Sequence, residues 1–120
     1  MENAKQDAAR LEFISQAMDC MPEAVTIISP QGIMLYYNKA ATEVLDRKPE
    51  YIGQDIHNHH SKPATNPRVD AMIQAFAEGR TEPFRYIAKP YGYAISVALA
   101  PILVEGEFLG CVQSVRRKED

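Results

Sequence analysis

All three histidines of this chain fall within one stretch of four residues, His57-Asn58-His59-His60. Neutral imidazole is a common ligand for zinc and for haem iron. A zinc site would need further ligands, such as Asp55 or a cysteine, and none stands at a spacing typical of zinc sites. Two interpretations stay open: one histidine binds haem iron, or the stretch is a solvated polar loop or a satisfied helix cap, which is the simpler reading.

A second feature that could shape a binding site is the alternation of large and small side chains over residues 93–100. Successive side chains of a strand point to opposite faces, so one face would be bulky and the other would be lined by small groups, Ser96 and Ala98 among them. We expect the small face to leave room for a ligand beneath a helix carrying Met72, Ile73 and Phe76, and the bulky face to pack against an N-terminal helix. The alternative is that larger helix side chains fill the space.

Asn38 stands where a strand gives way to a helix. The run over residues 24–29 is rich in β-branched side chains, and it is followed by a Pro30-Gln31-Gly32 turn and a second strand over residues 33–37. An Asn at a helix start accepts hydrogen bonds from the free N–H groups of the first turn. We therefore expect Asn38 to hold this junction.

Apolar periodicity and helix breakers predict the elements that position these residues. An apolar stripe that includes Leu11, Ile14 and Met18 indicates an N-terminal helix, which Pro22 ends. The pattern is that of an α+β chain with the order helix, two strands, short helices, helix, three strands. The expected helices cover residues 4–21, 38–45 and 68–78, and the expected C-terminal strands cover residues 84–89, 91–104 and 108–116.

Composition narrows the class of protein. The 120 residues suffice for one domain, and a net charge of −3 does not favour nucleic-acid binding. The sequence shows neither an apolar run of membrane-spanning length nor a secretory leader, so we expect a cytoplasmic protein.

Cys20 and Cys111 form no CxxC pair and lie in apolar runs, which predicts buried, inert thiols. No nucleotide-binding or nucleophile motif is present, and we expect no enzyme activity.

The hairpin, the Asn38-Lys39-Ala40 sequence at the helix start and Gly53 together resemble the beginning of a PAS sensor domain. The segment from Gly53 to Pro63 is similar to a subset of PAS domains in which a histidine precedes the long helix, and His60 matches that histidine. The resemblance covers residues 17–117. It implies a five-stranded antiparallel sheet with helices on one face and an N-terminal helix. The implied division is an N-terminal dimerisation helix over residues 1–21, a PAS domain over 22–117 and the possible start of a linker over 118–120.

The resemblance also implies a function: a sensory module that binds a small ligand or cofactor and signals by protein–protein interaction. Haem is the cofactor it suggests, with His60 as first choice of iron ligand and His59 and His57 as alternatives. Flavin is less favoured, because the segment before the long helix has no cysteine. The expected partners are a second copy of the chain, paired through the first helix, and a downstream signalling protein. The alternatives are a ligand-free dimerisation module and a small metal-binding protein that uses the histidines.

Overall fold

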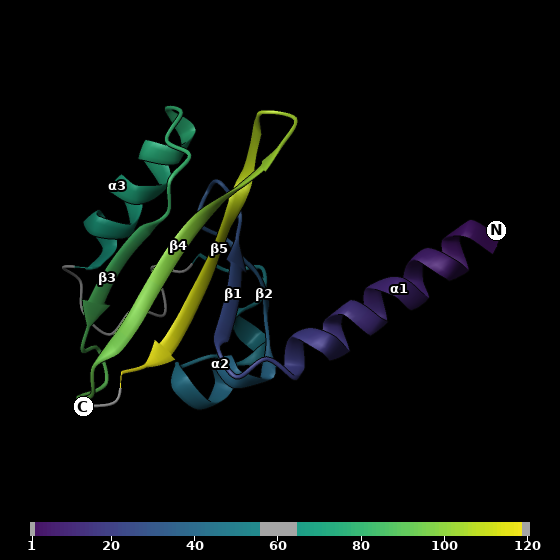
Figure 1. Ribbon diagram of the computed structural model, residues 1–120, viewed down its shortest axis with the longest axis horizontal. Helices are drawn as coiled ribbons and strands as arrows, with labels where there is room; N and C mark the ends of the chain where they lie inside the picture. The colour runs from purple at the N-terminus through teal and green to yellow at the C-terminus, as the bar shows by residue number, and fades with distance from the viewer. Residues whose placement is uncertain (1, 56–64, 119–120) are drawn as a thin grey trace.

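The structure is a computed structural model that describes residues 2–55 and 65–118. Five strands form one antiparallel sheet in the order β2-β1-β5-β4-β3, and two helices cover one of its faces (Figure 1). This arrangement, with a helix before the first strand, confirms the α+β fold expected from the sequence. The elements are α1 (Glu2–Asp19), β1 (Ala24–Ile28), β2 (Met34–Tyr37), α2 (Lys39–Val44), the 3₁₀ turn η1 (Pro49–Tyr51), α3 (Thr65–Ala77), β3 (Phe84–Ala88), β4 (Ile95–Val104) and β5 (Glu107–Arg117).

Strands β1 and β2 form the hairpin that the sequence predicts. Gly32, with φ of 84°, supplies the left-handed backbone of the turn between them. Thr26 pairs with Tyr37 and Ile28 with Met34 across the two strands. Since β1 also pairs with β5, it lies inside the sheet, and β2 forms an edge. The polar side chain of Thr26 is therefore carried into the middle of the sheet.

The C-terminal strands β3, β4 and β5 form a meander with long pairing between β4 and β5. Strand β4 begins at Ile95, four residues later than the sequence predicts. Residues 90–93 form a turn, where Gly92 adopts a φ of 86°. Apolar composition alone does not show this turn, because Tyr91 and Tyr93 pack against the core although they lie outside the strand.

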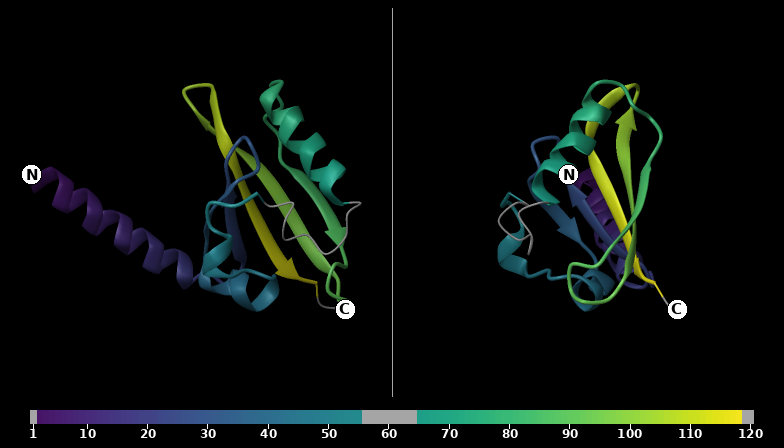
Figure 2. Two further views of the ribbon diagram at one scale, coloured as in Figure 1. Left: turned by 180° about the vertical axis from the view of Figure 1, so that it is seen from behind. Right: turned by 90° about the vertical axis from the view of Figure 1, so that its left-hand side faces the viewer.

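The hydrophobic core lies between the sheet and the two helices on its covered face (Figure 2). Under α3, Met72, Ile73 and Phe76 pack against Leu99 of β4 and Cys111 of β5. Near α2, a second cluster continues the same layer. Its buried members are Ala24, Ala41, Leu45, Ile95, Val97 and Val115.

The two faces of β4 are therefore the reverse of what we expected from the sequence. Ile95, Val97 and Leu99 are buried beneath α2 and α3, while Ser96 and Ala98 lie on the opposite face and are half-buried. Helix side chains need large apolar partners across the core, and the bulky row provides them. The expectation that the bulky row packs against the N-terminal helix is wrong for the same reason.

Helix α1 extends away from the rest of the molecule (Figures 1 and 2). Its apolar side chains stay in solvent: Leu11 is 68% exposed, Phe13 70% and Ile14 55%. Among the described residues, hydrogen bonds join α1 to the body only at its C-terminal end, at Met18 and Asp19. Among residues 2–55 and 65–118, no helix is both long and apolar enough to cross a membrane.

The two cysteines differ in environment. Cys111 is fully buried in β5, as the sequence predicts. Cys20 is exposed just after α1, so the expectation that it is buried is wrong. The helix ends at Asp19, and Cys20 lies in the exposed connection that leads to β1.

Candidate functional site

The side chain of Asn38 joins three segments of the chain by hydrogen bonds. Its Oδ1 accepts from the backbone N–H of Val25 at 2.8 Å and of Ala41 at 3.2 Å. Its Nδ2 donates to the carbonyl oxygens of Met18 at 2.8 Å and Glu23 at 3.0 Å. The predicted cap of α2 is confirmed, and the same side chain also joins the end of α1 to β1.

Polar side chains gather in the core layer between the sheet and α3. Thr26 of β1 and Gln113 of β5 pair across their strands and face inward. Arg47, in the loop after α2, reaches both of them: its Nε donates to Thr26 Oγ1 at 3.2 Å and its Nη2 to Gln113 Oε1 at 3.3 Å. A small cavity adjoins this group, with a volume of about 20 Å³. Its lining consists of Thr26, Ile28, Arg47, Val69, Met72, Tyr86, Leu99 and Gln113.

The guanidinium of Arg47 is a positive charge at the half-buried margin of this layer. Burial lowers the pKa of Arg47 from its ordinary value, and the neighbouring hydroxyl of Tyr91 and carboxylate of Asp46 oppose that shift. A guanidinium does not lose its proton at ordinary pH, so the side chain stays charged. The cavity is therefore an electropositive pocket in the core.

Tyr86 forms another polar part of the cavity wall. The guanidinium of Arg68, on α3, lies 4.1 Å from the centre of the Tyr86 ring, a cation–π contact between helix and strand. Burial raises the pKa of Tyr86, and the charge of Arg68 acts against that rise. The phenol is thus neutral at physiological pH and can donate a hydrogen bond.

The structure separates the site residues expected from the sequence. Met72, Ile73 and Phe76 lie together in the core under α3, and Met72 lines the cavity. Ser96 and Ala98 line a different hollow, of about 230 Å³, on the uncovered face of the sheet. Its other lining residues include Arg85, Arg116 and Ser114, whose Oγ donates to Glu23 Oε2 at 2.5 Å. These two groups of residues cannot face one ligand, because the sheet lies between them.

His57, His59 and His60 lie outside the described residues, as does most of the segment that resembles the histidine-containing PAS subset. Within residues 2–55 and 65–118, no group of three or more histidine, cysteine or acidic side chains is placed to hold a metal ion. Haem ligation by these histidines therefore stays a prediction.

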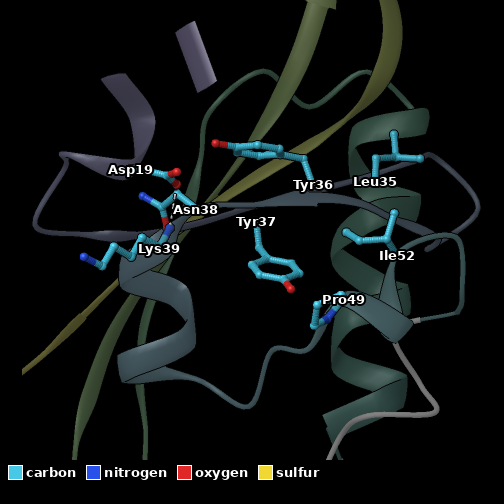
Figure 3. A pocket seen from close by; sticks show the side chains of 8 residues that line it. All are labelled: Asp19, Leu35, Tyr36, Tyr37, Asn38, Lys39, Pro49 and Ile52. Atoms are coloured by element: carbon cyan, nitrogen blue, oxygen red, sulfur yellow. Dashed lines mark hydrogen bonds between the residues drawn. The ribbon is translucent and has the colours of Figure 1, made fainter. Parts of the chain in front are cut away.

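An open groove of about 440 Å³ lies beside the edge strand β2 (Figure 3). Tyr36 and Tyr37 leave β2 on opposite sides, and Leu35 and Ile52 stand together at one end of the groove (Figure 3). The hydroxyl of Tyr36 is buried and has no hydrogen-bond partner within the described part of the chain. At the other end, the backbone N–H of Lys39 donates to Asp19 Oδ1 at 2.8 Å.

Sequence reasoning missed Arg47, Thr26 and Gln113. A signal for two of them was present, because Thr26 and Gln113 interrupt the apolar pattern of two strands at positions that face the core. A polar residue at an inward position needs a partner, and such residues are markers of a site. Arg47 gave no such signal, since a charged residue in a loop is usually solvated.

Comparison with known proteins agrees with this architecture. The family model for the PAS domain matches residues 17–116. The PAS domain of BvgS from Bordetella pertussis superposes with a TM-score of 0.74 at 18% identity, covering 93% of this chain and 88% of that one. A PAS domain from Colwellia psychrerythraea gives a TM-score of 0.66 at 20% identity, covering 90% and 96%.

A third similar structure is the photoactive yellow protein domain of the sensor histidine kinase Ppr from Rhodospirillum centenum. It gives a TM-score of 0.66 at 19% identity, with 86% of this chain and 92% of that chain covered. No curated protein matches the sequence. At these identities the structures show the fold alone, whereas the family model spans most of the sequence. The chain therefore belongs to the PAS family of sensory and signalling domains.

Proposed function

We propose that this PAS domain is a sensory module, not an enzyme, that binds a small ligand between the sheet and α3 and passes the change to a partner protein through α1. The observation that carries the proposal is the polar group in the core, where Arg47, Thr26 and Gln113 meet beside a cavity. A domain that served only as a scaffold would gain stability from apolar contacts at these positions.

A short physical path connects the cavity to α1. Thr26 lines the cavity, and its neighbour Val25 donates its backbone N–H to Asn38. Asn38 in turn donates to the carbonyl oxygen of Met18, near the end of α1. A ligand that moves β1 would therefore alter the hydrogen bonds that set the direction of α1.

The partner that α1 suits is a second copy of this chain. Leu11 and Ile14 are exposed on one stripe of a helix that, within the described ranges, has no neighbouring element along most of its length. A helix of this length gains most of its stability from packing an apolar face, and a symmetric partner would provide that packing. A downstream signalling protein would then respond to the geometry of the pair.

We place the module in the cytoplasm. Both cysteines are free, and Cys20 is exposed. Exposed free thiols persist in reducing compartments and are oxidised in secreted proteins. This assignment is independent of the ligand.

Native mass spectrometry of the purified protein tests the sensory proposal. We expect a fraction of the protein to carry a bound small molecule, which is released on denaturation and raises the thermal midpoint when added back. A protein with no retained molecule, and with no stabilisation by any member of a metabolite panel, would be a ligand-free dimerisation module. The same spectra record the mass of the assembly, so ligand binding and dimerisation are measured separately.

Haem ligation by His60, with His59 and His57 as alternatives, stays a prediction. Within the described residues, the cavity under α3 has about the volume of a water molecule and is far too small for a porphyrin or a flavin. Haem reconstitution of the wild type and of His57→Ala, His59→Ala and His60→Ala tests the assignment. Loss of the Soret shift in His60→Ala alone would support it, and a colourless wild type would exclude it.

A further inference from the structure

The hollow on the uncovered face of the sheet lies over the small side chains of β4. Ser96 and Ala98 line it, and they leave its floor low between the longer side chains of the neighbouring strands. Arg85 of β3 pairs with Ala98, and Arg116 of β5 pairs with Ser96. Directly paired residues of neighbouring strands point to the same face of a sheet. The two arginines therefore flank the hollow, one from each strand beside β4.

Arg85 and Arg116 differ from the other arginines in having no contact partner. Within residues 2–55 and 65–118, neither guanidinium forms a hydrogen bond, an ion pair or a contact with an aromatic ring. The remaining arginines each make at least one such contact, and they are Arg10, Arg47, Arg68, Arg80 and Arg117. The two arginines without a partner are thus the two that line one hollow.

Glu23 also lines the hollow, but its carboxylate does not neutralise the arginines. It accepts a hydrogen bond from the Ser114 hydroxyl and forms no ion pair with either arginine. Glu23 is half-buried, whereas both arginines are exposed and stand on the open side of the hollow. Two like charges that face one hollow repel each other, and an anion placed between them is attracted to both. The lining residues therefore favour an anionic ligand.

We propose that this hollow binds a phosphate group, free or as part of a small metabolite, between Arg85 and Arg116. A guanidinium presents its N–H groups in a planar fork that matches two phosphate oxygens, and two forks can hold a tetrahedral group from opposite sides. The Ser96 hydroxyl is a further donor. The volume of about 230 Å³ is many times the ~15 Å³ that one water needs. The site shares no lining residue with the cavity under α3, so it stands or falls independently of the proposed function.

Titration of the full chain with inorganic phosphate, followed by two-dimensional ¹H–¹⁵N NMR, tests the site. Sodium chloride keeps the ionic strength constant, because attraction between exposed charges is screened by salt. We expect saturable shifts that are largest for the backbone amides of Ser96, Ala98 and Ser114. Acetate, a planar anion with one charge, should bind more weakly. No saturable shift in these amides, or acetate binding as tight as that of phosphate, would overturn the proposal.

Arg85→Gln and Arg116→Gln each remove one of the proposed phosphate ligands at an exposed position, where the fold should tolerate the change. We expect the dissociation constant for phosphate to rise about fivefold in each variant. Arg117→Gln is the matched control. Arg117 follows Arg116 in β5 but pairs with Ile95, and its guanidinium lies 4.1 Å from the centre of the Tyr93 ring. Equal weakening by all three variants would reflect net charge alone and would overturn the proposal.

Glu23→Gln gives a test of opposite sign. The variant keeps an acceptor for the Ser114 hydroxyl and removes the negative charge from the hollow. We expect the dissociation constant for phosphate to fall about threefold, and an unchanged value would overturn the placement of the anion in this hollow. Glycerol 3-phosphate separates the two sources of the phosphate group. Tighter binding than inorganic phosphate supports a phosphorylated metabolite, whereas weaker binding supports free phosphate.

Discussion

At the scale of single residues, Asn38 has the largest structural role of any polar side chain in the described structure. It is 1% exposed and its amide makes four hydrogen bonds to backbone groups of three different segments. A simple helix cap contributes about 1 kcal/mol. Asn38 also bonds to a buried N–H of β1 and to half-buried carbonyl groups at the end of α1 and before β1, which a cap alone does not do.

We predict that Asn38→Ala lowers the free energy of unfolding by about 3 kcal/mol, because it leaves several buried backbone groups without partners. Urea denaturation measures this change. Glu43→Ala, at an exposed position of the same helix, is the control and should change stability by less than about 0.5 kcal/mol. An Asn38→Ala midpoint equal to that of the control would contradict the tethering role.

A second prediction at this scale concerns the buried thiol. Burial raises the pKa of Cys111 from its ordinary value of 9.0 to about 11. Between these values the unfolded chain releases the thiol proton and the folded chain keeps it, so a rise in pH from 9 to 11 favours unfolding. The effect is at most about 1.4 kcal/mol per pH unit.

Unfolding by urea at pH 8 and at pH 10.5 tests whether the Cys111 thiol lowers stability at high pH, with Cys111→Ala as the comparison. We expect the stability difference between wild type and Cys111→Ala to shrink at the higher pH. Cys20→Ala should lose stability with pH in parallel with the wild type, because Cys20 is exposed. If the difference in free energy of unfolding between wild type and Cys111→Ala is the same at both pH values, the thiol does not contribute to the pH dependence of stability.

The sequence predicted the structural role of Asn38 but not that of Arg47, and one physical reason explains both outcomes. The role of Asn38 follows from its neighbours in the chain, since a strand, an Asn and a helix stand in order. The role of Arg47 depends on Thr26 and Gln113, which are 21 and 66 residues away along the chain. Local pattern carries no information about such contacts until the topology of the sheet is known.

At the scale of elements, strand β5 depends on a glycine where it crosses β1. Gly110 has φ of 139°, and a Cβ at this position would collide with the carbonyl oxygen of Ile28. The neighbour is backbone in the centre of the sheet, so it cannot move without parting the two strands. Only glycine allows this close approach.

We predict that Gly110→Ala destabilises the domain by about 3 kcal/mol, through strain and lost pairing between β1 and β5. Gly106→Ala is the matched control. Gly106 has φ of 81° in the turn before β5, and nothing lies within 4 Å of a Cβ there, so the control should cost only about 1 kcal/mol. Thermal unfolding followed by circular dichroism compares the two, and equal losses would mean that the contact with Ile28 is relaxed at little cost.

The two faces of β4 show what a sequence pattern can predict and what it cannot. Alternation in β4 correctly separates Ser96 and Ala98 from Ile95 and Val97, because side-chain direction in a strand is a local property. It does not say which face the helices cover. That depends on α2 and α3, whose large apolar side chains select the bulky face as their partner.

At the scale of the whole molecule, the resemblance of the hairpin, the Asn38 junction and Gly53 to the start of a PAS domain predicted the fold, and the order of elements agreed with it. The position of α1 was not predictable in the same way. Its stripe of Leu11, Ile14 and Met18 is compatible with packing on the sheet or with packing on another chain. The structure excludes the first for most of the helix, because Leu11 and Ile14 remain exposed.

An 18-residue helix that stands free in water is only marginally stable. In the described part of the chain, helix α1 is joined to the body only near its C-terminal end, through Asn38 and Asp19, so its first turns gain no stability from the described body. Pairing with the α1 helix of a second copy would bury Leu11 and Ile14 and stabilise those turns. The exposed stripe therefore predicts a homodimer.

We predict that Leu11→Glu combined with Ile14→Glu converts the dimer to a monomer in sedimentation equilibrium, because like charges would be brought together in an apolar contact. Gln16→Glu is the control: it adds charge to the same helix on the side away from the stripe, and it should leave the dimer intact. The double variant should also lose helical signal in far-ultraviolet circular dichroism, by an amount that corresponds to the first turns of α1. A wild type that sediments as a monomer up to high micromolar concentration, with α1 still helical, would contradict pairing through this helix.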